Sequence, residues 1–331
     1  MNRELIFKRV AFSSATLILF ILLSIFIMLF ISAKPAMSEY GLHFLVDSSW
    51  GKIIEIKSDT SKTVKKVQKQ SVGKDENLFA DEDTPVIAGS PDSVDNQPQT
   101  EVKTKTVYGG FIPIVGTIFS TLIAMVFSVP IAMGIAVFLS EIAPNFLVKP
   151  VGMAIELLAA IPSIIYGMWG LFYFAPIIQK VVGGSQISLL TAGLVLGVMI
   201  LPFMAAITRD AMNTAPDVLK ESAYSLGATK FEVVKDVIFP YAKVGIIGSI
   251  ILSLGRALGE TMAVAFLIGS VFKIPHTLTS PTISIPVVLA NNFGEADPQM
   301  MSSLFYLAFI LFVLSFGVIG LAKFYFLKGR R

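Results

Sequence analysis

Six apolar runs, each long enough to cross a lipid bilayer, limit what this chain of 331 residues can fold into. A membrane-spanning α-helix needs about 20 mainly apolar residues and satisfies its backbone hydrogen bonds internally. Hydrophobic residues make up 54% of the sequence and charged residues 15%, which excludes an ordinary soluble domain. The sequence therefore predicts an all-α membrane protein with six transmembrane helices. The predicted spans are 11–32, 110–140, 151–177, 186–207, 243–271 and 301–325.

Two of these runs need interpretation before the spans can be counted. The second is long and contains Pro130, and the part after this proline is too short to cross alone, so we expect one span, either a kinked helix or a helix with a cytoplasmic extension. The first follows Arg3, Lys8 and Arg9, as a signal peptide would. It is longer than the apolar region of a signal peptide, and no small-residue cleavage site closes it. We therefore expect it to be retained as the first helix.

Lysine and arginine in the short loops predict the orientation, because cytoplasmic loops carry an excess of both. With the N-terminus inside, the short outer loops hold only Lys180 and Lys273. Both termini are therefore expected in the cytoplasm, which agrees with an even number of spans. The basic residues then placed on the cytoplasmic side are Arg3, Lys8, Arg9, Lys149, Arg209, Lys220, Lys230, Lys235, Lys243, Lys323, Lys328, Arg330 and Arg331.

The first outer loop, residues 33–109, is much longer than the others and is expected on the extracytoplasmic side. A loop of this length is largely exempt from the charge rule, so its lysines do not contradict the orientation. Its central part, about 51–106, alternates in charge and has few aromatic residues, which favours a mobile or weakly folded insertion. A solvated spacer is the simpler interpretation, and an element that contacts a partner is the alternative.

Several kinds of chemistry lack the residues they need. The chain has no cysteine, which excludes disulfides and thiolate metal sites. Its two histidines, His43 and His276, leave almost no material for a metal site or a catalytic triad, and no P-loop motif is present to bind a nucleotide. The net charge is +3, and no basic cluster with interleaved aromatic residues indicates nucleic-acid binding. We expect no catalytic residue and no metal site.

The longest cytoplasmic segment, residues 209–240, has the pattern of two short helices. Pro216 followed by the acidic Asp217 is typical of a helix start. Gly227 is typical of the position just after a helix end. One face of this first helix carries an apolar stripe at helical spacing, made of Leu219, Ala223 and Leu226.

A second short helix, residues 230–238, is expected to stop before Pro240, because proline lacks a backbone donor and clashes with a preceding carbonyl. The two helices and the glycine turn would form a compact knob on the cytoplasmic face. From these features alone, a docking element and a simple loop are equally good interpretations of the knob.

A family resemblance favours the docking element. The cytoplasmic signature of ABC-importer permeases is Glu-Ala-Ala, three residues, Gly, nine residues and Ile-x-Leu-Pro. This chain is similar to it at every spacing, with serine, valine and phenylalanine as departures that keep the size class. The resemblance implies that the segment is the coupling helix, which sits in a cleft of an ATPase subunit. The matching residues are Glu221, Ser222, Ala223, Gly227, Val237, Phe239 and Pro240.

Other stretches resemble the permeases of phosphate-specific ABC importers more than those of molybdate, sulfate or sugar importers. They are residues 41–50, 108–141, 159–172 and 253–270, and the resemblance fails over about 51–106. It implies the type I importer permease fold, a bacterial inner membrane and phosphate as cargo. A permease for molybdate or sulfate is the nearest alternative. An ATPase-independent channel or secondary transporter is the more distant one.

The resemblance also implies the partners. One permease chain forms half of a pathway beside a second, homologous permease, and an extracytoplasmic binding protein delivers phosphate. Two copies of an ATPase subunit bind ATP and Mg²⁺, so this chain is expected to be no enzyme and to hold no cofactor. The expected organisation is an N-terminus with the first helix (1–32), an outer loop (33–109) and a five-helix permease core (110–331) with the coupling segment (209–240).

The fifth predicted span carries two charges, Arg256 and Glu260, close to the middle of the bilayer. A spacing of four places them on nearly the same side of a helix, about 40° apart. An unpaired charge at this depth costs at least about 2.5–3.5 kcal/mol, so both are expected to face protein or water. The guanidinium of Arg256 presents a planar fork of donors that fits two phosphate oxygens. We expect both residues to line the substrate pathway, with Glu260 as the counter-ion; a structural ion pair is the alternative.

Further residues in the spans bear on helix packing. Gly255 and Gly259 have the spacing that lets another helix approach closely, although ordinary glycine usage in membrane helices explains them almost as well. Glu156 is interpreted as interfacial, with a positive residue on a neighbouring helix as its candidate partner. Pro162 and Gly167 predict a local break in the third span.

Overall fold

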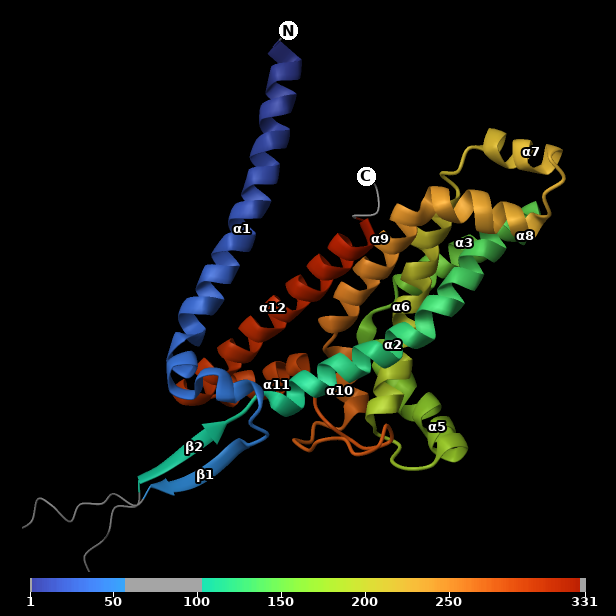
Figure 1. Cartoon of the computed structure of the whole chain (residues 1–331). Helices are drawn as coiled ribbons and strands as arrows, with labels where there is room; N and C mark the ends of the chain where they lie inside the picture. Colours follow the sequence, from blue (N-terminus) through green and yellow to red (C-terminus); the bar gives the residue numbers. More distant parts are fainter. Residues whose placement is uncertain (1, 57–102, 328–331) are drawn as a thin grey trace, which may run out of the picture. The chain divides into compact units, whose positions relative to one another are not determined.

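The computed structural model describes residues 2–56 and 103–327 (Figure 1). Most of the predicted insertion, residues 57–102, lies outside the described residues. The chain divides into two compact units, one made of Met1–Trp50 with Tyr108–Arg331 and the other of Gly51–Val107. The first unit holds all of the described helices.

Two strands form the two ends of the predicted insertion, about 51–106. Strands β1 (Trp50–Ile56) and β2 (Lys103–Tyr108) pair in a two-stranded sheet. Their β-branched and aromatic residues are of the kinds favoured in strands. The expectation of a mobile or weakly folded chain from residue 51 did not include this pairing, because the two segments are far apart in the sequence.

Six helices of the described residues are long and apolar enough to cross a membrane, which confirms the predicted fold class. Their apolar stretches are Ile6–Leu45, Phe111–Ile142, Ser163–Val182, Leu189–Met212, Lys230–Leu258 and Pro298–Phe324. The corresponding helices are α1 (Asn2–Tyr40), α2 (Phe111–Val137), α4 (Ser163–Trp169) with α5 (Ala175–Val182), α6 (Leu189–Met212), α9 (Phe239–Leu258) and α12 (Pro298–Leu327).

The second predicted span is a single helix, α2, which agrees with the prediction of one span. It continues through Pro130 to Val137 and then passes into a π turn, Phe138–Ile142. Helices α2 and α6 lie side by side (Figure 1). The hydroxyl of Ser128 donates to the carbonyl of Gly197 at 2.9 Å, which joins the two helices where the residues are small.

Gly116 on α2 lies where the backbone of another segment approaches closely. A Cβ at this position would collide with the carbonyl oxygen of Ile283. We expect Gly116→Ala to lower the free energy of unfolding by about 1–3 kcal/mol, because overpacking displaces the neighbouring backbone. Thermal unfolding of the detergent-purified protein checks this. Gly134→Ala on the same helix is the control, since a Cβ there has no atom within 4 Å; equal melting temperatures of the two variants would contradict the prediction.

The third predicted span is not a continuous helix. Helix α3 (Asn145–Ala159) ends before Pro162, and α4 begins at Ser163, so the membrane-spanning part is Ser163–Val182 rather than 151–177. Proline disfavours a helical conformation of the residue before it, which explains the break. The break predicted at Pro162 is thus confirmed. Gly167, in contrast, lies inside α4, and a Cβ there would be 2.9 Å from the ring of Phe266.

The fifth predicted span, 243–271, is also broken. Helix α9 ends at Leu258, and the next helix, α10 (Met262–Ile268), begins after three non-helical residues. Gly259 follows the end of α9 and has a low helix propensity. The chain then forms α11 (Ile285–Asn292) and enters α12. The break places Arg256 in the last turn of α9 rather than in the middle of a helix.

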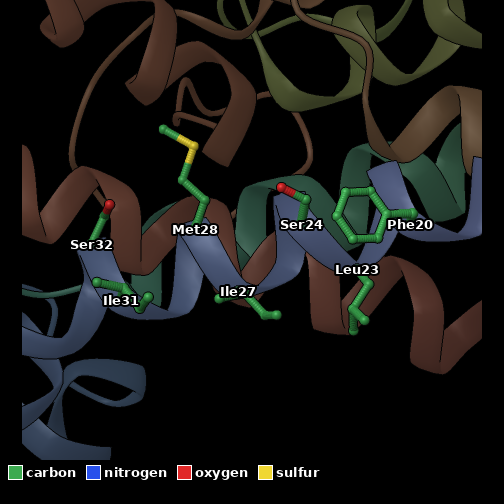
Figure 2. A pocket seen from close by; sticks show the side chains of 7 residues that line it. All are labelled: Phe20, Leu23, Ser24, Ile27, Met28, Ile31 and Ser32. Atoms are coloured by element: carbon green, nitrogen blue, oxygen red, sulfur yellow. The ribbon is translucent and has the colours of Figure 1, made fainter. Parts of the chain in front are cut away.

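Helix α1 packs against α12 through aromatic side chains. The rings of Phe26 and Phe30 lie 5.5 Å and 5.7 Å from that of Phe309. Much of α1 is exposed in the single chain, as its large apolar side chains show. In a membrane, such a surface faces lipid or another protein chain. A pocket of about 380 Å³ lies along α1. Figure 2 shows the side chains that line it, which are Phe20, Leu23, Ser24, Ile27, Met28, Ile31 and Ser32.

Candidate functional site

A short helix and a glycine turn connect α6 to the helix that becomes α9 (Figure 1). Helix α7 (Asp217–Ser225) ends just before Gly227, whose φ is +87°. The N–H of Gly227 donates to the carbonyl of Tyr224 at 2.9 Å, and that of Ala228 donates to Ala223 at 3.1 Å. These two bonds are the Schellman motif, which ends a helix with one residue in the left-handed region. Gly227 therefore has the helix-ending position predicted for it.

The apolar stripe on α7 points largely away from its own chain. Leu219 is 43% exposed and Leu226 is 90% exposed, whereas Ala223 packs on the buried cluster at this end of the protein. Glu221 and Ser222 are exposed as well. Exposed leucines on a short helix that ends in a Schellman motif are typical of a surface that binds another protein.

The helix after the turn continues through Pro240, so the predicted stop before this proline is wrong. Helix α8 (Lys230–Glu232) leads into a π turn, Val233–Ile238, and directly into α9. The N–H of Phe239 bonds the carbonyl of Val234, five residues back. The wider π turn accommodates a proline that a regular helical turn would exclude.

Two ion pairs join helices at this end of the protein. Arg209 on α6 binds Glu156 on α3 at 3.2 Å and its neighbour Asp210 at 2.8 Å. The predicted contact of Glu156 with a positive residue on another helix is thus confirmed. Lys220 on α7 binds Glu141 in the π turn that follows α2, at 2.8 Å. Sequence reasoning missed this second pair; its signals are a glutamate that ends an apolar span and a lysine beside the coupling signature.

Arg256 extends from the last turn of α9, and it is exposed in the single chain. Its guanidinium carbon lies 5.4 Å from the ring centre of Phe203 on α6, which is a cation–π distance. Within the described ranges no carboxylate forms an ion pair with it. The charge therefore lies at the surface of this chain, where a second chain or water can adjoin it, rather than in the core.

Glu260 does not share a helix face with Arg256, which corrects the prediction from their spacing. Because α9 ends at Leu258, the four-residue spacing crosses a break instead of one helical turn. A carboxylate oxygen of Glu260 accepts the N–H of Ala263 at 3.2 Å, at the start of α10. The N-terminal end of a helix favours such a negative charge. The break thus has a guanidinium before it and a carboxylate bound to backbone after it.

The two glycines beside these charges differ in their surroundings. A Cβ on Gly255 would lie 3.1 Å from the side chain of Ile319 on α12, so this glycine does allow close helix packing. Gly259 caps the end of α9, and the nearest atom to its Cβ position is the carbonyl oxygen of Gly255, at 3.9 Å. Helix packing therefore explains Gly255, and the helix break explains Gly259.

Known proteins are similar to this chain over most of its length. Residues 113–330 match the family model described as binding-protein-dependent transport system inner membrane component. The phosphate transport system permease protein PstC of Pasteurella multocida is 49% identical over 236 residues, which cover 65% of this chain and 74% of that protein. The protein of the same name from Mesorhizobium japonicum is 36% identical over 346 residues, which cover 98% of this chain and 90% of that protein.

A solved structure agrees on the fold. The inward-facing MetNI methionine ABC transporter superposes with a TM-score of 0.51 at 20% identity, over 65% of this chain and 92% of that one. At this identity the likeness shows the fold alone, which is that of a type I ABC importer permease. The chain therefore belongs to the binding-protein-dependent transport system inner membrane component family, and the relatives it matches there are named phosphate transport system permease protein PstC.

Proposed function

We propose that this chain is the permease subunit of an ABC importer for inorganic phosphate, in which it forms half of the translocation pathway. The observation that carries the proposal is the 36% identity to a phosphate permease over 98% of the chain, which includes both the coupling segment and the intramembrane arginine. The outward-facing leucines of α7 support it, because a coupling helix must present apolar side chains to an ATPase.

The proposed complex places this chain among four kinds of subunit. A second, PstA-like permease completes the pathway, and a pair of PstB-like ATPases binds ATP and Mg²⁺ and hydrolyses the ATP. A PstS-like extracytoplasmic protein delivers phosphate. We place the complex in the bacterial inner membrane, with both termini cytoplasmic and residues 33–109 outside. The residues proposed to form or position the ATPase contact are Glu221, Ser222, Ala223, Gly227 and Pro240.

Arg256 is proposed to contact phosphate in the pathway. Arg256 lies within the candidate span Lys230–Leu258, and a charge at the centre of a bilayer costs at least about 2.5–3.5 kcal/mol when it faces lipid. We therefore propose that its exposed side adjoins water or the second permease. Phosphate near neutral pH is an anion, and a guanidinium can donate to two of its oxygens at once. The cation–π contact with Phe203 does not require the N–H donors of the guanidinium, which can therefore bind phosphate.

Glu260 is proposed to serve the pathway indirectly. Its negative charge would repel phosphate, so it is a poor direct ligand. In the state described, its carboxylate binds the N–H of Ala263 and not Arg256. We propose that movement at the Leu258–Thr261 break brings Glu260 to Arg256 after phosphate has left, which neutralises the guanidinium in the empty pathway.

Phosphate uptake by the reconstituted complex tests the function. We expect proteoliposomes that contain this chain, its candidate second permease and ATPase, and the binding protein to accumulate phosphate only when ATP is hydrolysed. An excess of sulfate or molybdate should leave the rate unchanged. The measurement is uptake of labelled phosphate with and without ATP, and with each competing anion.

Each rival function predicts a different result in this assay. A permease for another oxyanion would give ATP hydrolysis stimulated by molybdate or sulfate and not by phosphate. A channel or secondary transporter would give uptake by this chain without the ATPase. Either outcome would overturn the proposed function.

A further inference from the structure

The coupling helix α7 is held to the rest of its chain by few side chains. None of its residues is buried, and Ala223 packs on a cluster that includes Val233 and Ile238 of the π turn leading into α9 and also Ala136 of α2. Lys220 is the charged residue of α7 that turns inward, with a side chain that is 16% exposed. This inward charge needs an explanation, since a lysine on such a short surface helix would otherwise extend into water.

The partner of Lys220 belongs to a different helix. Its Nζ lies 2.8 Å from Oε1 of Glu141, whose side chain is only 8% exposed. Glu141 lies in the π turn Phe138–Ile142 at the end of α2, and 79 residues separate it from Lys220. The pair therefore joins α7 to the helix that packs along α6 in the membrane part of the protein.

Other ion pairs near α7 include side chains that are much more exposed. Lys220 also lies 3.8 Å from Asp217, but that side chain is 86% exposed. Lys235 and Asp236 are 4.0 Å apart, and both are 63% exposed. Exposed pairs of this kind contribute little, whereas removing one member of a buried pair leaves an uncompensated charge. Among the described residues near α7, the Lys220–Glu141 pair is the one with both members largely shielded.

We propose that the Lys220–Glu141 ion pair couples movement of α7 to α2, so that both residues position the pathway helices for transport. The inference rests on the proposed coupling of α7 to an ATPase. When the ATPase moves α7, its apolar contacts carry that movement to the cluster at the start of α9, and the ion pair adds a direct charged link to α2. Glu141 lies in a π turn, and single π turns within helices are frequent at functional sites. Without the pair this direct link to α2 is lost, and less phosphate is transported for each ATP hydrolysed.

Charge reversal tests the proposal in the purified complex with its ATPase and binding protein. We expect Lys220→Glu and Glu141→Lys each to lower the ratio of phosphate transported to ATP hydrolysed by at least about tenfold, since each places like charges together. The double variant, Lys220→Glu with Glu141→Lys, should restore the ratio to at least about half of wild type, because the opposite charges face each other again. Lys180→Glu, at an exposed lysine on α5 (Ala175–Val182) that has no part in the proposed coupling, is the control and should leave the ratio unchanged.

Assembly and thermal stability, measured in the same samples, separate positioning from simple stabilisation. A stabilising pair alone would lower the amount and melting temperature of the complex but leave the ratio in the assembled fraction unchanged, and that result overturns the proposal. Failure of the double variant to restore the ratio while both single variants assemble also overturns it. Should a reversal prevent assembly, Glu141→Gln keeps the shape of the side chain, and an unchanged ratio in it overturns the proposal. A wild-type chain that binds no ATPase would instead reject the proposed function itself.

Discussion

Replacing Arg256 by glutamine is expected to abolish phosphate uptake while the complex stays assembled and the ATPase stays bound. A hydrogen bond to a charged group contributes about 1.5–3 kcal/mol. Loss of two such bonds to the anion therefore lowers uptake at least about a hundredfold, since about 1.4 kcal/mol corresponds to a factor of ten. The fold should tolerate the change, because the side chain is exposed in the single chain and the nearest aromatic contact, to Phe203, is a weak one.

A graded series makes the Arg256 result specific. Arg256→Lys keeps the charge but loses the planar fork, so its uptake should fall between those of wild type and Arg256→Gln. Lys243→Gln removes an exposed basic residue from the opposite end of the same helix and should leave uptake unchanged. The measurement is ATP-driven uptake of labelled phosphate at equal amounts of assembled complex. Uptake by Arg256→Gln at the wild-type rate would leave a role in helix packing as the explanation of this residue.

Local patterns in the sequence predicted the parts of the site that depend on neighbouring residues. The apolar runs predicted the six spans because a bilayer requires about 20 apolar residues whatever the tertiary contacts are. Gly227 was predicted to follow a helix end because the Schellman motif is formed within six residues. The break at Pro162 was predicted for a similar reason, since the effect of a proline on the residue before it is local.

The wrong predictions concern segments where the same local sequence is compatible with two backbone structures. Pro240 was expected to end a helix, but the π turn Val233–Ile238 accommodates it and the helix continues. Arg256 and Glu260 were placed on one helix face because the apolar run continues past them. Hydrophobicity alone does not distinguish one span from a helix, a break and a second helix. The end of α9 at Leu258 became visible only in the structure.

A positive partner on a neighbouring helix was expected for Glu156, but the identity of the partner in a long-range pair could not be predicted from a single sequence. Lys220 and Glu141 are each ordinary in their local context, a lysine on a polar helix and a glutamate at the end of an apolar span. Their meeting depends on how α7 folds back against α2, which no local pattern encodes. The pairing of β1 with β2 is unpredictable for the same reason, because the two strands are separated by residues 57–102.

Replacing Gly227 by proline should prevent the ATPase from binding, whereas Arg256→Gln should leave the ATPase bound. Proline fixes φ near −65° and lacks an N–H, whereas Gly227 has a φ of +87° and donates to Tyr224. The Schellman turn cannot form, so α7 loses the end that holds Leu226 outward. We expect co-purification of the ATPase with the Gly227→Pro chain to fall at least about tenfold, as a loss of about 1.4 kcal/mol already gives that factor.

Asparagine at the same position separates the turn from the mere presence of a side chain. A Cβ on Gly227 meets no atom within 4 Å, so the cost of a substitution comes from backbone conformation and not from a clash. Most side chains cost about 1–2 kcal/mol in the left-handed region, but asparagine tolerates it. Gly227→Asn should therefore retain ATPase binding and uptake, and Gly227→Val should lie between asparagine and proline. Equal ATPase binding by the proline and asparagine variants would show that the left-handed turn does not position α7 for the ATPase. The expected order, together with intact ATPase binding in Arg256→Gln, would assign coupling to the turn and phosphate contact to the arginine.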